Sequence, residues 1–163
     1  MTLDDLNRLD ATRAHAEFLR CCGSTRWAAA MTNARPFDSL DAMRVRGDDA
    51  WRMLSRSDWL EAFAAHPKIG ERRSVSAWSA AEQAGMRSAD DNVRARLEQL
   101  NAEYEDRFGY IFIVCATGKT PSDMLALIQS RMTHDPDAEL PVAADEQRQI
   151  TALRLAKLLD GQA

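Results

Sequence analysis

Apolar residues recur along most of this chain at the three- and four-residue spacing of an amphipathic helix. The clearest case is 90–108, where five apolar residues follow one another at intervals of four, three, four and four: Val93, Leu97, Leu100, Tyr104 and Phe108. This spacing places their side chains on one face of a helix. Asp90 or Asp91 can cap its start, and Gly109 can close its end in the left-handed conformation.

The same spacing, together with capping residues, predicts six further helices. They cover about 10–22, 27–31, 40–54, 58–65, 121–132 and 142–159, with a polar loop over 133–141. The expected N-caps are Thr25, Asp38 or Ser39, Ser57 and Thr120. Thr120 is followed by Pro121, which suits the first position of a helix because its missing N–H needs no partner there.

The segment 110–116 differs from the rest, because it is β-branched and aromatic and lies between Gly109 and Gly118. A lone strand cannot satisfy its own backbone, and no partner strand is apparent. We therefore expect a buried extended segment between helices, whose amides and carbonyls can bind a polar ligand. The predicted fold class is all-α: one single-domain helical bundle over 1–163 with a short extended segment near 110–116.

Composition and charge exclude several classes of function. The chain has 163 residues, 45% hydrophobic and 28% charged, with a net charge of −4. This is typical of one soluble globular domain. No basic patch stands out, so we expect no nucleic-acid partner. The longest apolar run, 111–116, is too short to cross a membrane.

The cysteines indicate a reducing compartment. Cys21 and Cys22 are adjacent and Cys115 is the third, so a disulfide framework is not expected, and no metal-ligand spacing is present. The first residues are acidic rather than apolar and do not resemble a signal peptide. These observations predict a cytoplasmic protein. Cys115 is expected to be a buried apolar residue rather than a nucleophile.

His66 is the first candidate for chemistry. Pro67 pushes the backbone of the preceding residue out of the helical region, so His66 is expected at the end of a helix. Helix carbonyls there favour a protonated imidazole, which can act as general acid or base. The alternative is a histidine that only decorates the helix end.

Three further candidates lie at 79–83. Ser79 and Glu82 have the spacing of a capping box, with Ser79 as N-cap and Glu82 at the third position. Spacing alone favours this structural role. Gln83 adds a polar group at the same helix start, whose unpaired N–H groups suit an anionic ligand.

Arg154 shares a helix face with Ile150 and Leu158. An arginine in this position either extends its stem to solvent or pairs with a buried carboxylate, of the protein or of a ligand. Arg131, near Ile128 and Met132, poses the same alternative. The three histidines are too scattered to indicate a zinc site.

Taken together, three segments resemble the 2-oxo-4-hydroxy-4-carboxy-5-ureidoimidazoline (OHCU) decarboxylases, a family of urate degradation. They are 66–71 (HPKIGE), 79–85 (SAAEQAG) and 107–116 (RFGYIFIVCA). Residues 101–104 and 150–155 also fit, and the three segments occur in the expected order across nearly the whole chain. The resemblance implies an all-α enzyme without a cofactor, commonly a homodimer, that converts OHCU to (S)-allantoin.

The resemblance also implies roles for particular residues. His66 would be the catalytic acid or base, with Glu82 beside it as the second catalytic residue. Substrate contacts fall on Pro67, on Ser79 and Gln83, on the backbone of Phe112, Ile113, Val114, Cys115 and Ala116, and on Arg154. The assignment of Arg154 rests on a looser motif. No metal ligand is implied.

Three other functions fit the same scaffold less well. The first is a non-catalytic helical interaction domain, which would tolerate loss of His66 and Glu82. The second is a related cofactor-free enzyme acting on another ureide or hydantoin, because pocket shape sets the choice of substrate. The third is a metal enzyme.

Overall fold

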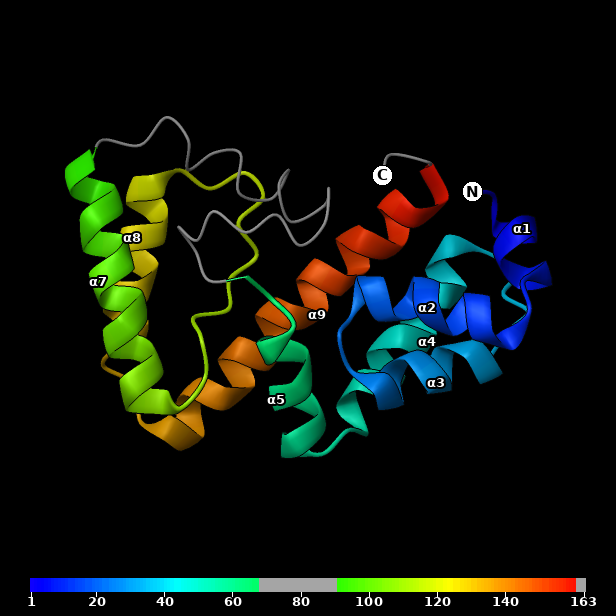
Figure 1. Ribbon diagram of the computed structural model, residues 1–163, viewed down its shortest axis with the longest axis horizontal. Coiled ribbons are helices and arrows are strands. Elements are labelled where there is room, and N and C mark those ends of the chain that lie inside the picture. Colours follow the sequence, from blue (N-terminus) through cyan, green and yellow to red (C-terminus); the bar gives the residue numbers. More distant parts are fainter. Residues whose placement is uncertain (68–90, 161–163) are drawn as a thin grey trace. The chain divides into compact units, whose positions relative to one another are not determined.

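The computed structural model of the chain describes residues 1–67 and 91–160, and these ranges contain eight α-helices and no β-strand. The all-α fold class expected from the sequence is confirmed. The helices, shown in Figure 1, are α1 Leu3–Arg8, α2 Ala11–Cys21, α3 Thr25–Asn33, α4 Leu40–Arg52, α5 Arg56–Ala64, α7 Asp91–Phe108, α8 Pro121–Arg131 and α9 Pro136–Asp160.

The residues divide into two compact units, each described here by itself. Unit 1 contains Met1–Ala65 and Gln147–Ala163, and unit 2 contains His66–Glu146. Helix α9 therefore contributes its first part to unit 2 and the remainder to unit 1. The expectation that one domain covers 1–163 stays a prediction.

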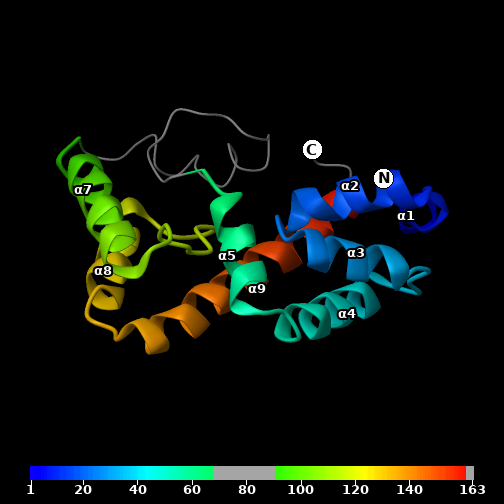
Figure 2. The ribbon, with the colours of Figure 1, turned by 60° about the horizontal axis from the view of Figure 1, so that its bottom comes forward.

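Unit 1 is built around helix α3, which lies between α2 and α4 in Figure 2 and also packs against α5. Trp27 of α3 is fully buried and meets Phe18 of α2 edge to face, with ring centroids 6.1 Å apart. Its indole N–H donates to the carbonyl of Gly47 in α4 over 2.9 Å. A Cβ at Gly47 would lie 3.3 Å from the Trp27 ring, so glycine permits this close helix contact.

Two predicted caps in unit 1 are wrong by one or two residues. Ser24, not Thr25, caps α3, because the Thr25 hydroxyl donates instead to Glu61 over 2.6 Å. Ser55, not Ser57, caps α5. Ser55 forms a reciprocal capping box with Asp58, and this pairing satisfies two backbone N–H groups at once. Ser39, one of two predicted alternatives, caps α4.

Unit 2 pairs α7 with α8. Four residues of the predicted apolar stripe of α7 are buried (Leu97, Leu100, Tyr104 and Phe108), while Val93 is half-buried. Gly109 follows with φ 82°, as predicted for a left-handed helix end. Thr120 caps α8 and Pro121 is its first residue, which also confirms the prediction.

Helix α9 begins earlier than predicted. The expected loop 133–141 is wrong, because the helix starts at Pro136 and continues through Pro141. The carbonyl of Asp135 accepts from the N–H groups of Ala138 and Glu139 over 3.0 and 2.9 Å, so the first turn forms before the second proline. A proline inside a helix costs about 3 kcal/mol. Burial of Glu139 in a charged cluster stabilises the turn that contains it.

Among the described residues, no helix has the length and apolar character that crossing a membrane requires.

Candidate functional site

His66 and Pro67 follow directly after helix α5. The helix ends at Ala64 with Ala65 as its C-cap, and the Ala65 N–H bonds to the carbonyls of Ala62 and Phe63. His66 and Pro67 are both half-buried. The prediction that His66 marks the end of a helix is confirmed.

Helix α5 is held in unit 1 along its length. Ala62 and Phe63 are fully buried. Glu61 accepts from both the N–H and the hydroxyl of Thr25, over 3.1 and 2.6 Å. Trp59 stacks on Trp51 with ring centroids 5.8 Å apart, and its indole N–H donates to the Trp51 carbonyl. These contacts fix the helix from which the chain continues to His66.

Ser79, Glu82 and Gln83 lie outside the described residues, as does the capping box predicted for the first two. Their part in the site stays a prediction.

The segment 110–116 is neither helix nor strand, and four of its predicted ligand-binding residues are buried: Phe112, Ile113, Val114 and Cys115. Ala116 is half-buried. Three backbone groups of the segment bond to side chains of the described residues. Arg131 donates to the Ile113 carbonyl over 2.6 Å, the Cys115 N–H donates to Glu146 over 2.6 Å, and Lys119 donates to the Cys115 carbonyl over 2.7 Å.

Arg131 belongs to a buried charged cluster that the sequence only partly indicated. Its guanidinium pairs with Glu139, which is fully buried, and lies 4.5 Å from the centroid of the Phe112 ring. Glu139 also accepts from the Tyr104 hydroxyl, and its second oxygen lies 2.8 Å from His134 Nδ1. Burial, and then the bond to Glu139, raise the pKa of the Tyr104 hydroxyl well above its usual range, so it stays a donor. Glu139 was missed because it falls in the predicted loop.

Arg154 is buried on α9, 7% exposed, between the buried residues Ile150 and Leu158. This confirms that it lies on an apolar helix face. Its positive charge lowers the pKa of the Cys21 and Cys22 thiols, but burial is the larger effect and raises the pKa of Cys22 to about 11 and that of Cys21 further. Both thiols are therefore neutral at physiological pH and, like that of Cys115, are in no disulfide bond.

These candidates belong to different parts of the molecule. His66, Pro67 and 112–116 belong to unit 2, whereas Arg154 belongs to unit 1. Their convergence on one ligand stays a prediction. Among the groups of His, Cys, Asp and Glu in 1–67 and 91–160, none has an arrangement suited to a metal ion.

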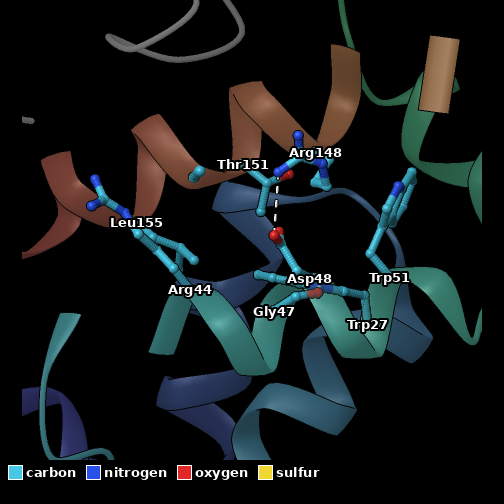
Figure 3. Close-up of a pocket in the computed structure, with 9 residues that line it drawn as sticks. Trp27, Arg44, Gly47, Asp48, Trp51, Arg148, Thr151 and Leu155 are labelled. Atoms are coloured by element: carbon cyan, nitrogen blue, oxygen red, sulfur yellow. Dashed lines mark hydrogen bonds and ion pairs between the residues drawn. The ribbon is translucent and has the colours of Figure 1, made fainter. Parts of the chain in front are cut away.

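Unit 1 also contains a small pocket between α3, α4 and α9, shown in Figure 3. Arg148 of α9 bridges it by an ion pair of 3.2 Å to Asp48 of α4. Trp27, Gly47 and Leu155 also line it. Its volume of about 10 Å³ has room for about one water molecule. An imidazoline with a ureido group does not fit, so this pocket is not the substrate site.

Comparison with known proteins decides the family. The family model for OHCU decarboxylase matches residues 7–156. The chain belongs to the OHCU decarboxylase family. The family's reaction is the decarboxylation of OHCU, which gives (S)-allantoin in urate degradation, and its members are carboxy-lyases.

Two curated relatives show how much of the chain the similarity covers. An OHCU decarboxylase of Haloferax volcanii is 33% identical over 96% of this chain and 95% of its own length. The uric acid degradation bifunctional protein TTL of Arabidopsis thaliana is 39% identical over 90% of this chain. The chain spans 48% of that bifunctional protein.

Two solved structures are similar to this chain in fold. A crystal structure of an OHCU decarboxylase in the presence of (S)-allantoin has a TM-score of 0.80 and 36% identity, covering 88% of this chain and 97% of that one. A second crystal structure, of an (S)-allantoin synthase, has a TM-score of 0.77 at 21% identity and supports the fold alone.

Proposed function

We propose that this chain carries out the family reaction, conversion of OHCU to (S)-allantoin, without a cofactor and with His66 and Glu82 as its catalytic residues. The observation that carries the proposal is the family match over 7–156, in which the His66-Pro67 pair stands at the end of helix α5. A half-buried imidazole at a helix C-terminus is suited to proton transfer near neutral pH.

The chemistry of OHCU explains why a histidine and a carboxylate can suffice. One ring carbon of OHCU carries both a carboxylate and a hydroxyl, and the adjacent carbon is part of a C=N bond. When CO2 leaves, the electron pair of the broken C–C bond forms a C=C bond, and the C=N π electrons move to nitrogen, which takes a proton. The resulting enol then becomes the ring amide carbonyl of allantoin when the hydroxyl loses a proton and the neighbouring carbon gains one.

His66 would manage this proton exchange. It takes the hydroxyl proton or controls the proton delivered to carbon, and delivery to one face alone gives (S)-allantoin. Glu82 orients His66 or holds the ureido N–H groups. Ser79, Gln83 and the backbone of 112–116 would fix the ring, with Pro67 lining the pocket, and Arg154 would bind a substrate oxygen through charge-assisted hydrogen bonds.

The first experiment generates OHCU from urate with urate oxidase and hydroxyisourate hydrolase and follows circular dichroism after this protein is added. The expected result is rapid appearance of the (S)-allantoin signal, whereas spontaneous decay gives the racemate and a fading signal. A folded protein that leaves the spontaneous course unchanged would refute the proposed reaction. A panel of other ureides and hydantoins would then test the related enzyme, and its failure would favour an interaction domain.

Two variants test the catalytic pair. His66→Ala and Glu82→Gln are each expected to lower kcat by about a hundredfold or more, the usual contribution of a positioned acid or base. His15→Ala on α2 is the matched control, because within 1–67 and 91–160 His15 makes only a long 3.4 Å contact with the Thr25 carbonyl. A folded His66→Ala protein with the full rate and stereoselectivity would contradict the mechanism.

We also propose that the enzyme is a cytoplasmic homodimer that takes a small-molecule substrate. The three buried cysteines form no disulfide, which fits a reducing compartment. Analytical ultracentrifugation at micromolar concentration tests the assembly, with a dimer mass expected. A monomer that is fully active would show that the site needs no second copy.

A further inference from the structure

The turn between α2 and α3 packs against the end of helix α5. Cys22 is the C-cap of α2 and Ser24 is the N-cap of α3, so Gly23 is the one residue between the two caps. A Cβ built on Gly23 would overlap the Cβ of Ala65, well inside the roughly 3.5–4.0 Å at which carbon atoms normally meet. Ala65 is the C-cap of α5 and directly precedes His66. The turn therefore lies against the residue from which the chain enters the candidate site.

Space, and not backbone conformation, requires glycine at this position. The glycines with positive φ among the described residues are Gly109 and Gly118, so Gly23 has a backbone that other residues can adopt. After the Ala65 Cβ, the nearest atoms of the described residues are the carbonyl oxygen and the Cα of Ala62, at 3.6 and 3.7 Å. Those distances are ordinary van der Waals contacts. Among the described atoms, it is therefore the Ala65 methyl group that excludes a side chain at Gly23.

The two sides of this contact differ in how easily they can move. Cys22 and Ser24, on either side of Gly23, are fully buried. Ser24 also accepts from the Trp27 N–H over 3.3 Å, which holds it at the start of α3. Ala65, in contrast, is exposed to solvent on its remaining surface. A methyl group added to Gly23 would therefore push the end of α5 outward by about 1 Å and leave the turn in place.

A second contact confines such a movement to the last turn of α5. Glu61 accepts from the N–H and the hydroxyl of Thr25 over 3.1 and 2.6 Å, one turn before Ala65. Phe63, between these two points, is fully buried. Because the helix is held by α3 up to this level, the displacement falls on the residues that follow it. Those residues include His66.

We propose that Gly23 is a positioning residue for His66. By carrying no side chain, Gly23 lets Ala65 pack against the turn, and this contact fixes the backbone that carries the imidazole. The proposal rests on the proposed function, in which His66 takes or directs a proton. Proton transfer requires donor and acceptor within hydrogen-bond reach, and a misplacement of about 1 Å can lower the rate about a hundredfold. Gly23 acts through Ala65 and is assigned no contact with substrate.

Compensating substitutions test the contact. Gly23→Ala should lower kcat per folded protein by about tenfold to a hundredfold at nearly unchanged KM, because a displaced acid or base destabilises the transition state more than it weakens substrate binding. Ala65→Gly removes the opposing methyl group, so the double variant should recover the kcat of Ala65→Gly alone. A general loss of stability would not be reversed by this second substitution.

Gly47→Ala is the matched control, because Gly47 is also a closely packed glycine of unit 1. Its new methyl group would meet Trp27 at 3.3 Å and Leu155 at 3.6 Å, which belong to α3 and α9 and not to α5. The kcat of this variant per folded protein should match that of wild type.

The position of His66 can also be measured without turnover. In ¹³C-histidine-labelled protein, the ring signal of His66 is identified as the one that His66→Ala loses. Gly23→Ala should shift this signal, and the double variant should return it to its position in Ala65→Gly. The signal of His134, in unit 2, should stay in place and serves as the internal reference.

Thr25→Val keeps the test decisive if Gly23→Ala does not fold. It removes the hydroxyl that bonds Glu61 and keeps the N–H that also bonds it, so α5 is loosened without a steric clash. The His66 signal should then shift in folded protein. An unmoved signal would overturn the proposal.

The outcomes for Gly23 and for the reaction are distinguishable. Full kcat in folded Gly23→Ala, a loss that Ala65→Gly does not rescue, or an unchanged His66 signal would each overturn the positioning role while wild-type turnover upholds the reaction. If the proposed reaction is wrong, wild type itself leaves OHCU to its spontaneous decay, while the ring signal still reports whether the contact between Gly23 and Ala65 fixes His66.

Discussion

Glu139 concentrates three interactions on one buried carboxylate. It pairs with Arg131, accepts from the Tyr104 hydroxyl and lies 2.8 Å from His134 Nδ1, with no exposure to solvent. Removal of one partner of such a pair leaves the other charge buried without compensation. The residue therefore matters to stability more than its place near a chain turn suggests.

We expect Glu139→Ala to lower the free energy of unfolding by about 3–5 kcal/mol, because the Arg131 guanidinium is left buried without its carboxylate. Urea denaturation followed by far-UV circular dichroism measures the change. Glu103→Ala, at an exposed position on α7, should cost less than about 0.5 kcal/mol. A loss below about 1 kcal/mol for Glu139→Ala would show that the cluster relaxes without it.

Cys22 is expected to make the stability of the folded protein depend on pH in the alkaline range. Burial raises the pKa of its thiol from 9.0 to about 11. Above pH 9 the unfolded chain releases this proton while the folded chain keeps it. The contribution of this thiol to the free energy of unfolding is therefore fully present below about pH 9 and is lost as the pH rises toward 11. The shift corresponds to about 3 kcal/mol at most.

The test compares urea unfolding of wild type and Cys22→Ala between about pH 8 and 11. Wild type should lose more stability over this interval than the variant does, because the variant lacks the titrating thiol. Equal losses in the two proteins would contradict the assignment to Cys22.

Several residue environments could be predicted from the sequence. The place of Arg154 on an apolar helix face, the burial of Cys115 and the burial of four of the five α7 stripe residues followed from helical spacing and residue type. The partner of Arg131 could not be predicted in this way, because Glu139 lies eight residues away across a segment that contains Pro136 and was expected to be a loop. Spacing reveals contacts within one helix, whereas this pair joins two helices.

At the scale of elements, the start of α5 is where the structure and the sequence prediction name different capping residues. Ser55 accepts from the Asp58 N–H, and Asp58 accepts from the Ser55 N–H over 3.0 Å. The backbone bond from Ser55 is the main cause of the lowered pKa of Asp58. Helix α5 leads directly to His66, so its start and its end both bear on the candidate site.

Ser55→Ala should cost about 1 kcal/mol of stability, the usual value of an N-cap. Ser57→Ala is the control, since the Ser57 side chain contacts Ser55 Oγ but caps no N–H. This variant should lose only a few tenths of a kcal/mol of stability, roughly the effect of an ordinary surface substitution. The prediction from sequence, with Ser57 as the cap, would require the opposite order. Thermal unfolding of both variants decides between them.

The misplaced caps and the early start of α9 share one physical cause. Ser24 and Thr25, or Ser55 and Ser57, are chemically equivalent as caps, and tertiary partners choose between them. Glu61 draws the Thr25 hydroxyl away in one case, and Asp58 selects Ser55 in the other. Pro141 likewise predicts a break in the helix. The helix nevertheless continues through it, because Glu139 is buried in a charged cluster that stabilises this part of α9. Where one residue alone could cap, as at Thr120, the sequence predicted the structure.

At the scale of the molecule, the proposed reaction places the electron sink in the substrate. The C=N bond of OHCU receives the electrons of the departing carboxylate, so no metal is needed to accept them. Dialysis against EDTA is expected to leave the rate of (S)-allantoin formation unchanged, as measured by circular dichroism. A loss of activity restored by one divalent cation would point to the metal-enzyme alternative.

The candidate site was predicted mainly from the resemblance to a family, and less from the spacing of apolar and polar residues along the sequence. Two structural predictions near the site are confirmed: His66 lies at a helix end, and the segment between α7 and α8 is buried over 112–115 without forming a helix. Their chemical roles came from the resemblance, because periodicity locates a helix face but says nothing of which ligand it meets.

The division of α9 between the two units has a consequence for biosynthesis. Unit 2 is continuous, from His66 to Glu146, whereas unit 1 combines Met1–Ala65 with residues after Glu146. During translation, every residue of unit 2 has therefore left the ribosome before unit 1 receives residues 147–160, which take roughly one to three seconds more to synthesise. Unit 1 is therefore begun first and completed last. Its first helices emerge without the segment of α9 that completes their unit, whereas all residues of unit 2 have already been synthesised by then.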